Sequence, residues 1–326
     1  MVEPKARRVA WTEERRRSDE GRRRIEGAPE ASNDAAGEKI LPRAHPGRWV
    51  AAAVALLLLA MVVHTIVTNP RFQWGIVNEY FTTRTVLDGL WLTLWMTAAV
   101  FTCGYVLGIG LAAARLSQNP VLRSLSFGYV WLIRSVPPLV QLLFWYELAS
   151  LYPRLSFGVP FGPAFATVKT AHLFTGILAA FTALTLDVAA FAAEIVRGGI
   201  LSVDRGQTEA AQSLGLSRAR IFRRIVLPQA MPAIVPASGN LVITMLKATS
   251  IVSVIAVPDL LYSVQLIYNQ NFLVIPLLLV ATLWYIIVCT VLSVGQYFVE
   301  RHYARGSTRT FWRISRANLP LGWPAT

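Results

Sequence analysis

The sequence is short of charged residues. Only 15% of its 326 residues are Asp, Glu, Lys or Arg, whereas 54% are hydrophobic and the mean hydropathy is +0.48. Soluble domains carry about 25% charged residues. This shortage argues against a soluble globular class and favours an integral membrane protein.

Cysteine is almost absent. The chain has two, Cys103 and Cys289, and both lie within apolar stretches. Such residues are more often small buried hydrophobic side chains than a disulfide or a ligand pair. We therefore expect no disulfide framework, no metal site and no cofactor held by this chain.

A phosphate-binding loop is also missing. No G-x-x-x-x-G-K-[ST] motif occurs, so the chain cannot cradle ATP phosphates in that way. His64 and His172 are isolated, without a nucleophile and base at a useful spacing. The sequence does not favour an enzyme, and any energy taken from ATP must come through a partner.

Long apolar stretches are what the sequence does contain. A transmembrane helix needs about 20 mostly apolar residues. Six stretches meet this length, at 49–68, 87–114, 127–151, 171–193, 232–257 and 272–299. Pro137-Pro138 should kink the third, because proline cannot donate to the helix ladder. We predict an all-α integral membrane protein.

The basic residues behind the formal net charge of +13 are concentrated in alternate loops between these spans. Arginines crowd the 194–231 loop and the residues after the last span, whereas the alternate loops are poor in them. The positive-inside rule then predicts a multi-pass membrane protein with both termini and the 194–231 loop in the cytoplasm. Topology accounts for the charge without invoking nucleic acid.

Composition divides the chain into four parts. Residues 1–48 read as a disordered cytoplasmic tail, and 49–68 as an uncleaved anchor helix rather than a signal peptide. Residues 85–299 form the transmembrane domain, and 300–326 a cytoplasmic C-terminal tail. Within the domain, 152–170 is expected to be an external loop, because it is rich in proline and glycine.

The most informative stretch is polar and lies between two spans: EAAQSLGLSRARIFRRIVLP, residues 209–228. Asp204 is a plausible N-cap with Gln207 reaching back, and Gly215 suits a left-handed helix stop. Ser217 could cap a second helix, with Leu216 and Ile221 as a hydrophobic staple. Pro228 is expected to end that helix before the next span.

Three interpretations of this hairpin compete. It could be an amphipathic linker resting on the inner leaflet, with its arginines at lipid headgroups. It could be a DNA-reading helix-turn-helix, although membrane spans tether it at both ends. It could also be a docking element that enters a groove on a cytoplasmic protein.

The spacing resembles the EAA loop of bacterial ATP-binding-cassette (ABC) importer permeases. Glu209-Ala210-Ala211 is followed by three residues, Gly215, nine residues, and Ile225-Val226-Leu227-Pro228. The flanking segments 194–200, 227–230 and 250–255 are similar to polar amino-acid permeases of the histidine/glutamine type. The resemblance covers about 85–299, leaving the tail and the first span outside it.

The resemblance implies a type I importer permease fold, with a five-helix core and one extra N-terminal helix. It implies that the hairpin couples the spans to a separate ATPase dimer, which binds ATP-Mg, through Glu209, Ala210, Ala211, Gly215, Leu227 and Pro228. The other partners it implies are a second permease chain, identical or homologous, and an extracytoplasmic amino-acid-binding protein. The binding protein would deliver substrate to outer loops that include 152–170 and 258–271.

Polar residues within the spans are candidates for the substrate pathway, since such groups are costly in lipid and usually face a cavity or a partner. Asp187 lies mid-span and could contact substrate or pair with Lys247 or Arg134, and Glu194 could pair with Arg197. Thr249 and Ser250 could simply bond to their own helix. The pathway candidates are Asp187, Glu194, Asn240, Thr244, Lys247 and Gln141.

Departures from the family pattern bear on the substrate. Ala248 stands where the family usually has an acid after the lysine, and Asp187-Val188 stands where an Asn-Ser pair is common. A carboxylate at 187 would suit a cationic amino acid. An alternative function is a proton-coupled secondary carrier that uses Asp187 without an ATPase.

Overall fold

The computed structural model describes residues 46–158 and 164–304, in two units divided after Thr68. The first unit contributes one described helix, α2 (Pro46–Thr68), which has no acidic residue in its first turn and no basic residue in its last turn. At 1.5 Å per residue its 23 residues reach about 35 Å, enough to cross a hydrocarbon core. Its described side chains are exposed over its whole length, so lipid or another helix must cover them. The expected 1–48 tail lies almost entirely outside the described residues.

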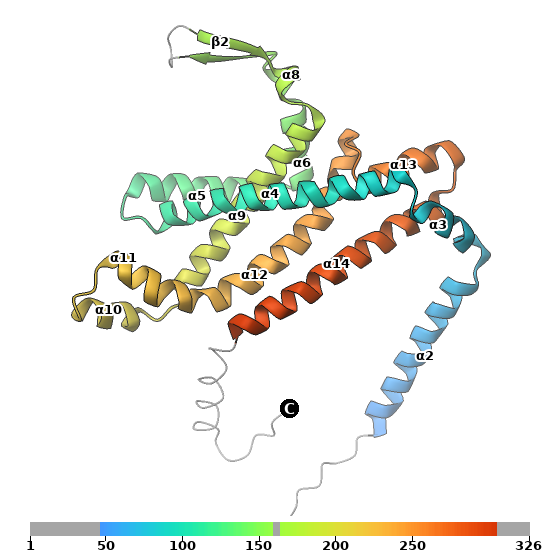
Figure 1. Cartoon of the computed structure of the whole chain (residues 1–326), viewed down its shortest axis with the longest axis horizontal. Helices are drawn as coiled ribbons and strands as arrows, with labels where there is room; N and C mark the ends of the chain where they lie inside the picture. The colour runs from blue at the N-terminus through green and yellow to red at the C-terminus, as the bar shows by residue number, and fades with distance from the viewer. Residues whose placement is uncertain (1–45, 159–163, 305–326) are drawn as a thin grey trace, which may run out of the picture. The chain divides into compact units, whose positions relative to one another are not determined.

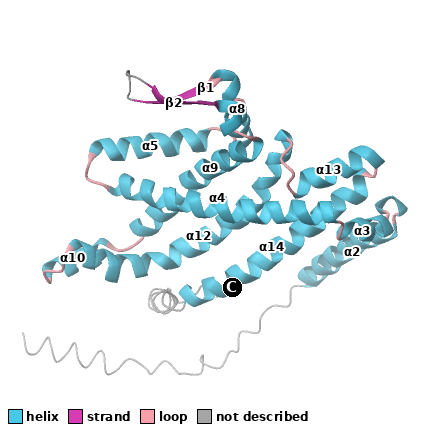
Figure 2. Cartoon of the chain, turned by 45° about the horizontal axis from the view of Figure 1, so that its top comes forward, coloured by secondary structure: helices cyan, strands magenta, loops and turns pink. Residues whose placement is uncertain are grey.

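The second unit is a helical domain with one small hairpin of strands (Figures 1 and 2). Its first half contains η2 (Pro70–Phe72), α3 (Trp74–Phe81), α4 (Arg84–Leu116), α5 (Pro120–Ser135), α6 (Pro138–Tyr146), α7 (Leu148–Leu151), β1 (Arg154–Gly158), β2 (Ala164–Lys169) and α8 (Thr170–Leu173). Its second half contains α9 (Gly176–Leu201), α10 (Arg205–Ser213), α11 (Arg218–Ile221), η3 (Phe222–Val226), α12 (Leu227–Ala248), η4 (Thr249–Ile255), α13 (Leu260–Asn271) and α14 (Val274–Ala304).

Five helices of the described chain are long and apolar enough to span a membrane: α2, α4, α9, the run Arg218–Ile255, and α14. The expected third span at 127–151 is wrong in its bounds. A helix starts at Pro120, capped by Asn119, and the chain bends by 100° between α5 and α6, at the double proline. The predicted kink is therefore confirmed. The change of direction is large because neither proline has an N–H that could continue the helical hydrogen bonds.

Two segments that were expected to be outer loops contain regular structure. The 152–170 loop contains the antiparallel pair β1–β2, with Arg154 opposite Lys169 and Ser156 opposite Thr167. The 258–271 segment is the helix α13, whose N-terminus is capped by the Asp259 side chain accepting from the Tyr262 N–H at 2.9 Å. Period-two alternation is too short at 154–158 to predict a strand. The helix cap at Asp259 could have been predicted from the sequence, because aspartate is a favoured N-cap residue and this one directly follows a proline.

The helix α9 forms the centre of the domain, and it packs along α4 (Figure 1). The contact is close because both helices carry small residues. A Cβ added at Gly108 would lie 2.5 Å from the Ala192 Cβ, and one at Gly104 would lie 2.7 Å from that of Val188. Close approach through small residues is the usual way that helices pack in membranes.

A second apolar cluster joins α3 and α13 to the N-terminal parts of α4 and α14. Val86, Leu260 and Leu277 are fully buried in it. Trp284 stacks on Phe81 with ring centroids 4.7 Å apart, and its indole N–H donates to the Phe81 carbonyl at 2.9 Å. These contacts hold the N-terminal part of α14 against the start of the domain.

Candidate functional site

The polar hairpin between α9 and α12 folds as two short helices joined by a left-handed turn. Asp204 caps α10, and its side chain accepts from the Gly206 N–H at 2.6 Å. Gly215 has a φ of +73°, so the predicted left-handed stop is confirmed. Gln207, expected to reach back to the cap, makes no such bond in the described part of the chain.

A small apolar cluster fixes the hairpin to the end of α9. Ala211, Ile221 and Val226 are buried in it, and Ile200 and Leu216 pack against them. Leu216 thus packs against the cluster that contains Ile221, which is consistent with the expected contact of these two residues. Glu209 and Ala210 are exposed, and they lie on the part of α10 that does not face this cluster. One side of the hairpin thus packs against the end of α9, and the side with Glu209 is exposed.

The second helix of the hairpin departs from expectation at both ends. Ser217 is the N-cap by backbone position, but its side chain makes no capping bond. Pro228 does not end the helix. A π-helical turn, η3, joins α11 to α12, and the Leu227 N–H donates to the Phe222 carbonyl. Because a proline in the first turn of α12 removes only an N–H that α-helical bonding does not need there, the helix runs on into the span.

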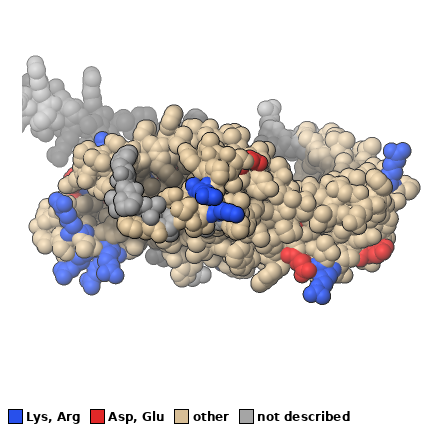
Figure 3. All heavy atoms as spheres, turned by 90° about the horizontal axis from the view of Figure 1, so that it is seen from above, with Lys and Arg blue, Asp and Glu red and all other residues tan. Residues whose placement is uncertain are grey.

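Basic side chains gather at the end of the domain where α10 and α11 lie (Figure 3). Arg205, Arg218, Arg220, Arg223 and Arg224 are all exposed. Among the described residues, none of them has a carboxylate within 4 Å.

Three of the candidate pathway residues share a face of α12. Asn240, Thr244 and Lys247 are exposed in the chain, as their spacing predicts. Asn240 accepts from the Gln296 side-chain amide of α14 at 3.2 Å. Thr249 and Ser250 bond back to the carbonyls of Leu246 and Lys247, each at 2.7 Å, so their predicted back-bonding is confirmed.

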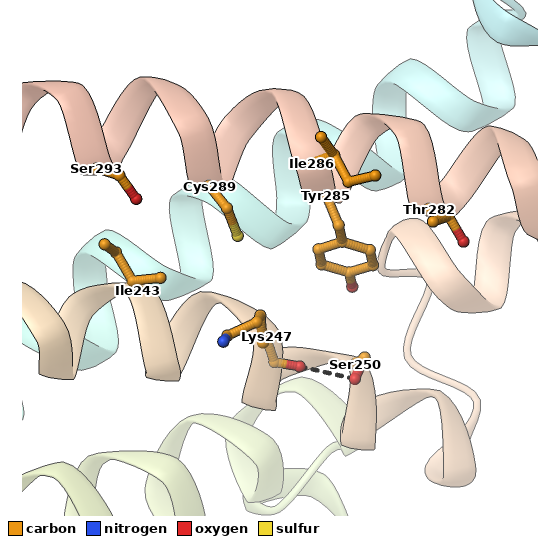
Figure 4. A pocket seen from close by; sticks show the side chains of 8 residues that line it. All are labelled: Ile243, Lys247, Ser250, Thr282, Tyr285, Ile286, Cys289 and Ser293. Carbon is orange, nitrogen blue, oxygen red and sulfur yellow. Dashed lines mark hydrogen bonds between the residues drawn. The ribbon is translucent and has the colours of Figure 1, made fainter. Parts of the chain in front are cut away.

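Lys247 lines an open groove of about 560 Å³ between α12 and α14. In Figure 4 its side chain and Ser250 lie opposite Tyr285 and Cys289 of α14. The remaining lining residues are Ile243, Thr282, Ile286 and Ser293. The lysine forms no ion pair with any described residue. A mid-span cation on an open groove calls for water or a further protein chain to cover it.

The carboxylates of α9 lie on another side of the domain. Glu194 accepts from Arg197, with a shortest distance of 2.7 Å, and its other oxygen is 3.6 Å from Arg115 of α4. The predicted pair with Arg197 is confirmed, and the contact with Arg115 was not foreseen. Arg115 also lies over the ring of Phe127, 4.5 Å from its centroid. Glu194 therefore joins α4 and α9 beside the start of α5.

Asp187 is 7% exposed and forms no ion pair in the described residues, with either Lys247 or Arg134. Arg134 lies over the ring of Phe191, one turn along α9 from Asp187, at 5.0 Å. Arg134 also lines a cavity of about 360 Å³, whose lining residues are Arg115, Phe127, Val130, Trp131, Arg134, Ser135 and Glu194 and do not include Asp187. Its aromatic and basic members were not predicted as site residues. The sequence signal that could have identified this cavity is Arg134, a cation three residues before the double proline Pro137-Pro138.

Gln141 has a local role. It is 6% exposed, and its amide donates to the carbonyls of Ile133 and Val136 at 2.9 Å each. These carbonyls lose their helical partners at the break between α5 and α6, so the side chain replaces part of the ladder. A place for Gln141 in the substrate pathway stays a prediction.

The cysteines and possible metal ligands complete the survey. Cys103 and Cys289 are both free, but Cys103 is exposed rather than buried, which corrects the expectation for that residue. Cys103 lies on a face of α4 that no other described helix covers. No group of three or more His, Cys, Asp or Glu side chains in the described ranges could hold a metal ion.

Comparison with known proteins matches the part of the chain that contains the hairpin 204–228. Residues 104–305 match the family model described as "Binding-protein-dependent transport system inner membrane component". The chain is 40% identical over 277 residues to the arginine transport system permease protein ArgU of Corynebacterium glutamicum, covering 82% of this chain and 84% of that protein. It is 31% identical to the probable glutamine ABC transporter permease protein GlnM of Bacillus subtilis, covering 66% and 91%.

A solved structure agrees. A chain in the crystal structure of an amino acid ABC transporter with histidines is 31% identical, with a TM-score of 0.59, covering 70% of this chain and 97% of that one. The MetNI methionine transporter, at 21% identity and a TM-score of 0.53, shares the fold. The similarity to ArgU extends over 277 residues, which is longer than the 85–299 segment in which the resemblance was expected.

Proposed function

The chain belongs to the family of binding-protein-dependent transport system inner membrane components, as an amino-acid ABC importer permease, and from this we propose that it imports a cationic amino acid by ATP-driven alternating access. ATP hydrolysis in such importers resides in a separate ATPase subunit. Family membership does not favour a proton-coupled carrier that works without an ATPase.

The hairpin 204–228 is the proposed point of coupling. A docking element must present side chains to a partner while being held firmly by its own chain. Glu209 and Ala210 are exposed on α10, whereas Ala211 and Ile221 fix the hairpin from below. From Arg218 to Ile255 the chain is one helical run. We propose that a movement of α10 and α11 imposed by the ATPase reaches α12 directly.

The substrate is proposed from one relative and one residue. The similar permease ArgU is an arginine transport protein by its printed name. In this chain Asp187 is a buried carboxylate without an ion-pair partner among the described residues, as a site for an ammonium or guanidinium group would require. Arginine or a related cationic amino acid fits both observations.

A second permease chain is proposed to cover the α12–α14 groove. Lys247 is exposed there in mid-span, and lipid would be a costly neighbour for it. A second copy or a homologue facing this groove would close a polar pathway. The pathway would have Asn240, Thr244 and Lys247 of α12 along this groove, and Asp187 and Glu194 of α9 would border it from another side of the domain. An extracytoplasmic binding protein would deliver substrate to the outer segments 152–170 and 258–271.

The coupling proposal is tested by reversing one charge on α10. We expect Glu209→Lys to leave the permease in the membrane but to abolish co-purification of the ATPase or substrate-stimulated ATP hydrolysis. The matched control is Gln207→Lys, which adds a cation about 200° around the same helix. Normal coupling in Glu209→Lys, or equal loss in both variants, would remove the hairpin from this role.

A further inference from the structure

A hollow lies between the hairpin and the ends of two spans. Its volume is about 680 Å³. It is bounded by the C-terminal ends of α4 and α9, by α10, and by the run from α11 into η3, at the end of the domain seen at the left of Figure 1. Its lining residues are Leu116, Gln118, Ile200, Leu201, Val203, Arg205, Thr208, Gln212, Arg218, Ile221, Phe222 and Val226.

The polar part of this lining has one sign of charge. Arg205 and Arg218 contribute guanidinium groups from two different helices, and no carboxylate lines the hollow. Neither arginine has a carboxylate within 4 Å among the described residues. Thr208, Gln118 and Gln212 add hydrogen-bonding groups. Guanidinium groups match phosphate oxygens in geometry as well as in charge.

The rest of the lining is apolar and open. Leu201 is 55% exposed and Phe222 is 42% exposed, although both are large hydrophobic residues. Leu116 is exposed beside them at the end of α4. The ligand that fits such a wall next to two arginines has an anionic head and an apolar body.

The position of the hollow agrees with this chemistry. Leu116 ends α4 and Leu201 ends α9, and both helices are long and apolar enough to span the membrane. The hollow is therefore level with the edge of the hydrocarbon core, where phosphate groups give way to acyl chains. Basic pockets between helices at the cytoplasmic side of membranes are known to bind anionic lipid head groups.

We propose that this hollow binds one anionic phospholipid, with its phosphate between Arg205 and Arg218 and its acyl chains along Leu116, Leu201 and Phe222. The inference rests on the proposed function for the cytoplasmic location of the hairpin. A lipid bound here touches α4, α9 and both helices of the hairpin at once. It ties the hairpin to the ends of the spans, and on α10 it lies one helical turn from the exposed Glu209, which shares a helix face with Arg205.

The test measures lipid retained by the purified transporter, permease with its ATPase, by native mass spectrometry after exchange into phosphatidylglycerol or phosphatidylcholine. We expect phosphatidylglycerol to remain bound and phosphatidylcholine to be lost. In Arg205→Gln/Arg218→Gln, retention of phosphatidylglycerol should fall about thirtyfold, since each basic residue near an anionic surface is worth about fivefold. The control Arg220→Gln/Arg223→Gln removes the same charge from residues that do not line the hollow.

Equal retention in the two double variants would overturn the site, because general attraction would then explain the lipid. Displacement by inorganic phosphate would reduce it to a plain anion site. Loss of lipid whenever the ATPase assembles would show that the partner fills the hollow. Phe222→Ser provides a second variant that keeps both charges, and it should lower retention as well.

Retention can also be measured on the permease without its ATPase. A failure of the coupling proposal, seen in Glu209→Lys, is thereby distinguishable from a failure of the lipid site.

Discussion

At the scale of single residues, two carboxylates of α9 are held in different ways: Glu194 is partly exposed and Asp187 is buried. Glu194 is neutralised by two arginines from its own chain, at 2.7 and 3.6 Å. Asp187, seven residues earlier on the same helix, has no ion-pair partner among the described residues. A carboxylate already paired contributes to structure, and an unpaired one is available to a ligand.

Replacing Asp187 by Asn keeps its size and removes its charge. We expect uptake of a cationic amino acid to fall tenfold or more, because a hydrogen bond to a charged group is worth about 1.5–3 kcal/mol. Assembly with the ATPase should be unchanged. Asp88→Asn, which removes an exposed carboxylate 3.8 Å from Arg84, is the control. Unchanged uptake of every amino acid tested would make Asp187 a structural residue.

Asp259 should make stability depend on pH. Burial raises the pKa of its carboxyl from 3.8 to about 6. Because the folded state favours the protonated form, this stabilising contribution is complete below the unfolded pKa and is lost as the pH rises through about 6. Asp259→Asn cannot titrate. The unfolding temperature of wild type, relative to that of this variant, should therefore fall between pH 4 and pH 7. A constant difference would contradict this.

At the scale of elements, the sequence predicts best where local chemistry decides. The left-handed stop at Gly215 and the cap at Asp204 depend on backbone and side-chain preferences of a few residues, and both are confirmed. The π-helical turn Phe222–Val226 lies directly before Leu227-Pro228, where the proline was expected to end the helix and does not. The strands at 154–169 and the arginine from α4 beside Glu194 are set by tertiary structure.

The contact between α4 and α9 gives a sharp test of packing. Gly108→Val would place its side chain against Ala192 and the carbonyl of Ala189, whereas a Cβ at Gly110 has nothing within 4 Å. Overpacking of this kind costs about 1–3 kcal/mol. Gly108→Val should therefore lower the unfolding temperature in detergent, and Gly110→Val should leave it nearly unchanged. Equal effects in the two variants would contradict the close approach of these helices.

At the scale of the whole molecule, the positions of the membrane faces follow from charge. The proposed topology places α10 in the cytoplasm and the β1–β2 hairpin outside. In a chain with Cys103 and Cys289 replaced, Ser213→Cys should react with an impermeant thiol reagent only from the cytoplasmic side. Ser156→Cys should react only from the outside, and labelling of both from one side would refute the topology.

The helical run from Arg218 to Ile255 has a mechanical consequence, although it includes a π-helical turn, three prolines and a 3-10 stretch. A continuous helical run transmits rotation as well as displacement, and each residue of its α-helical part turns it by 100°. One residue inserted between the hairpin and the span would swing the Lys247 stripe away from its groove, unless the turn at Phe222–Val226 absorbed it. The number of residues between the hairpin and the span therefore sets the rotation of the Lys247 face relative to the hairpin. The length of this helical run matters even at positions where side-chain identity does not.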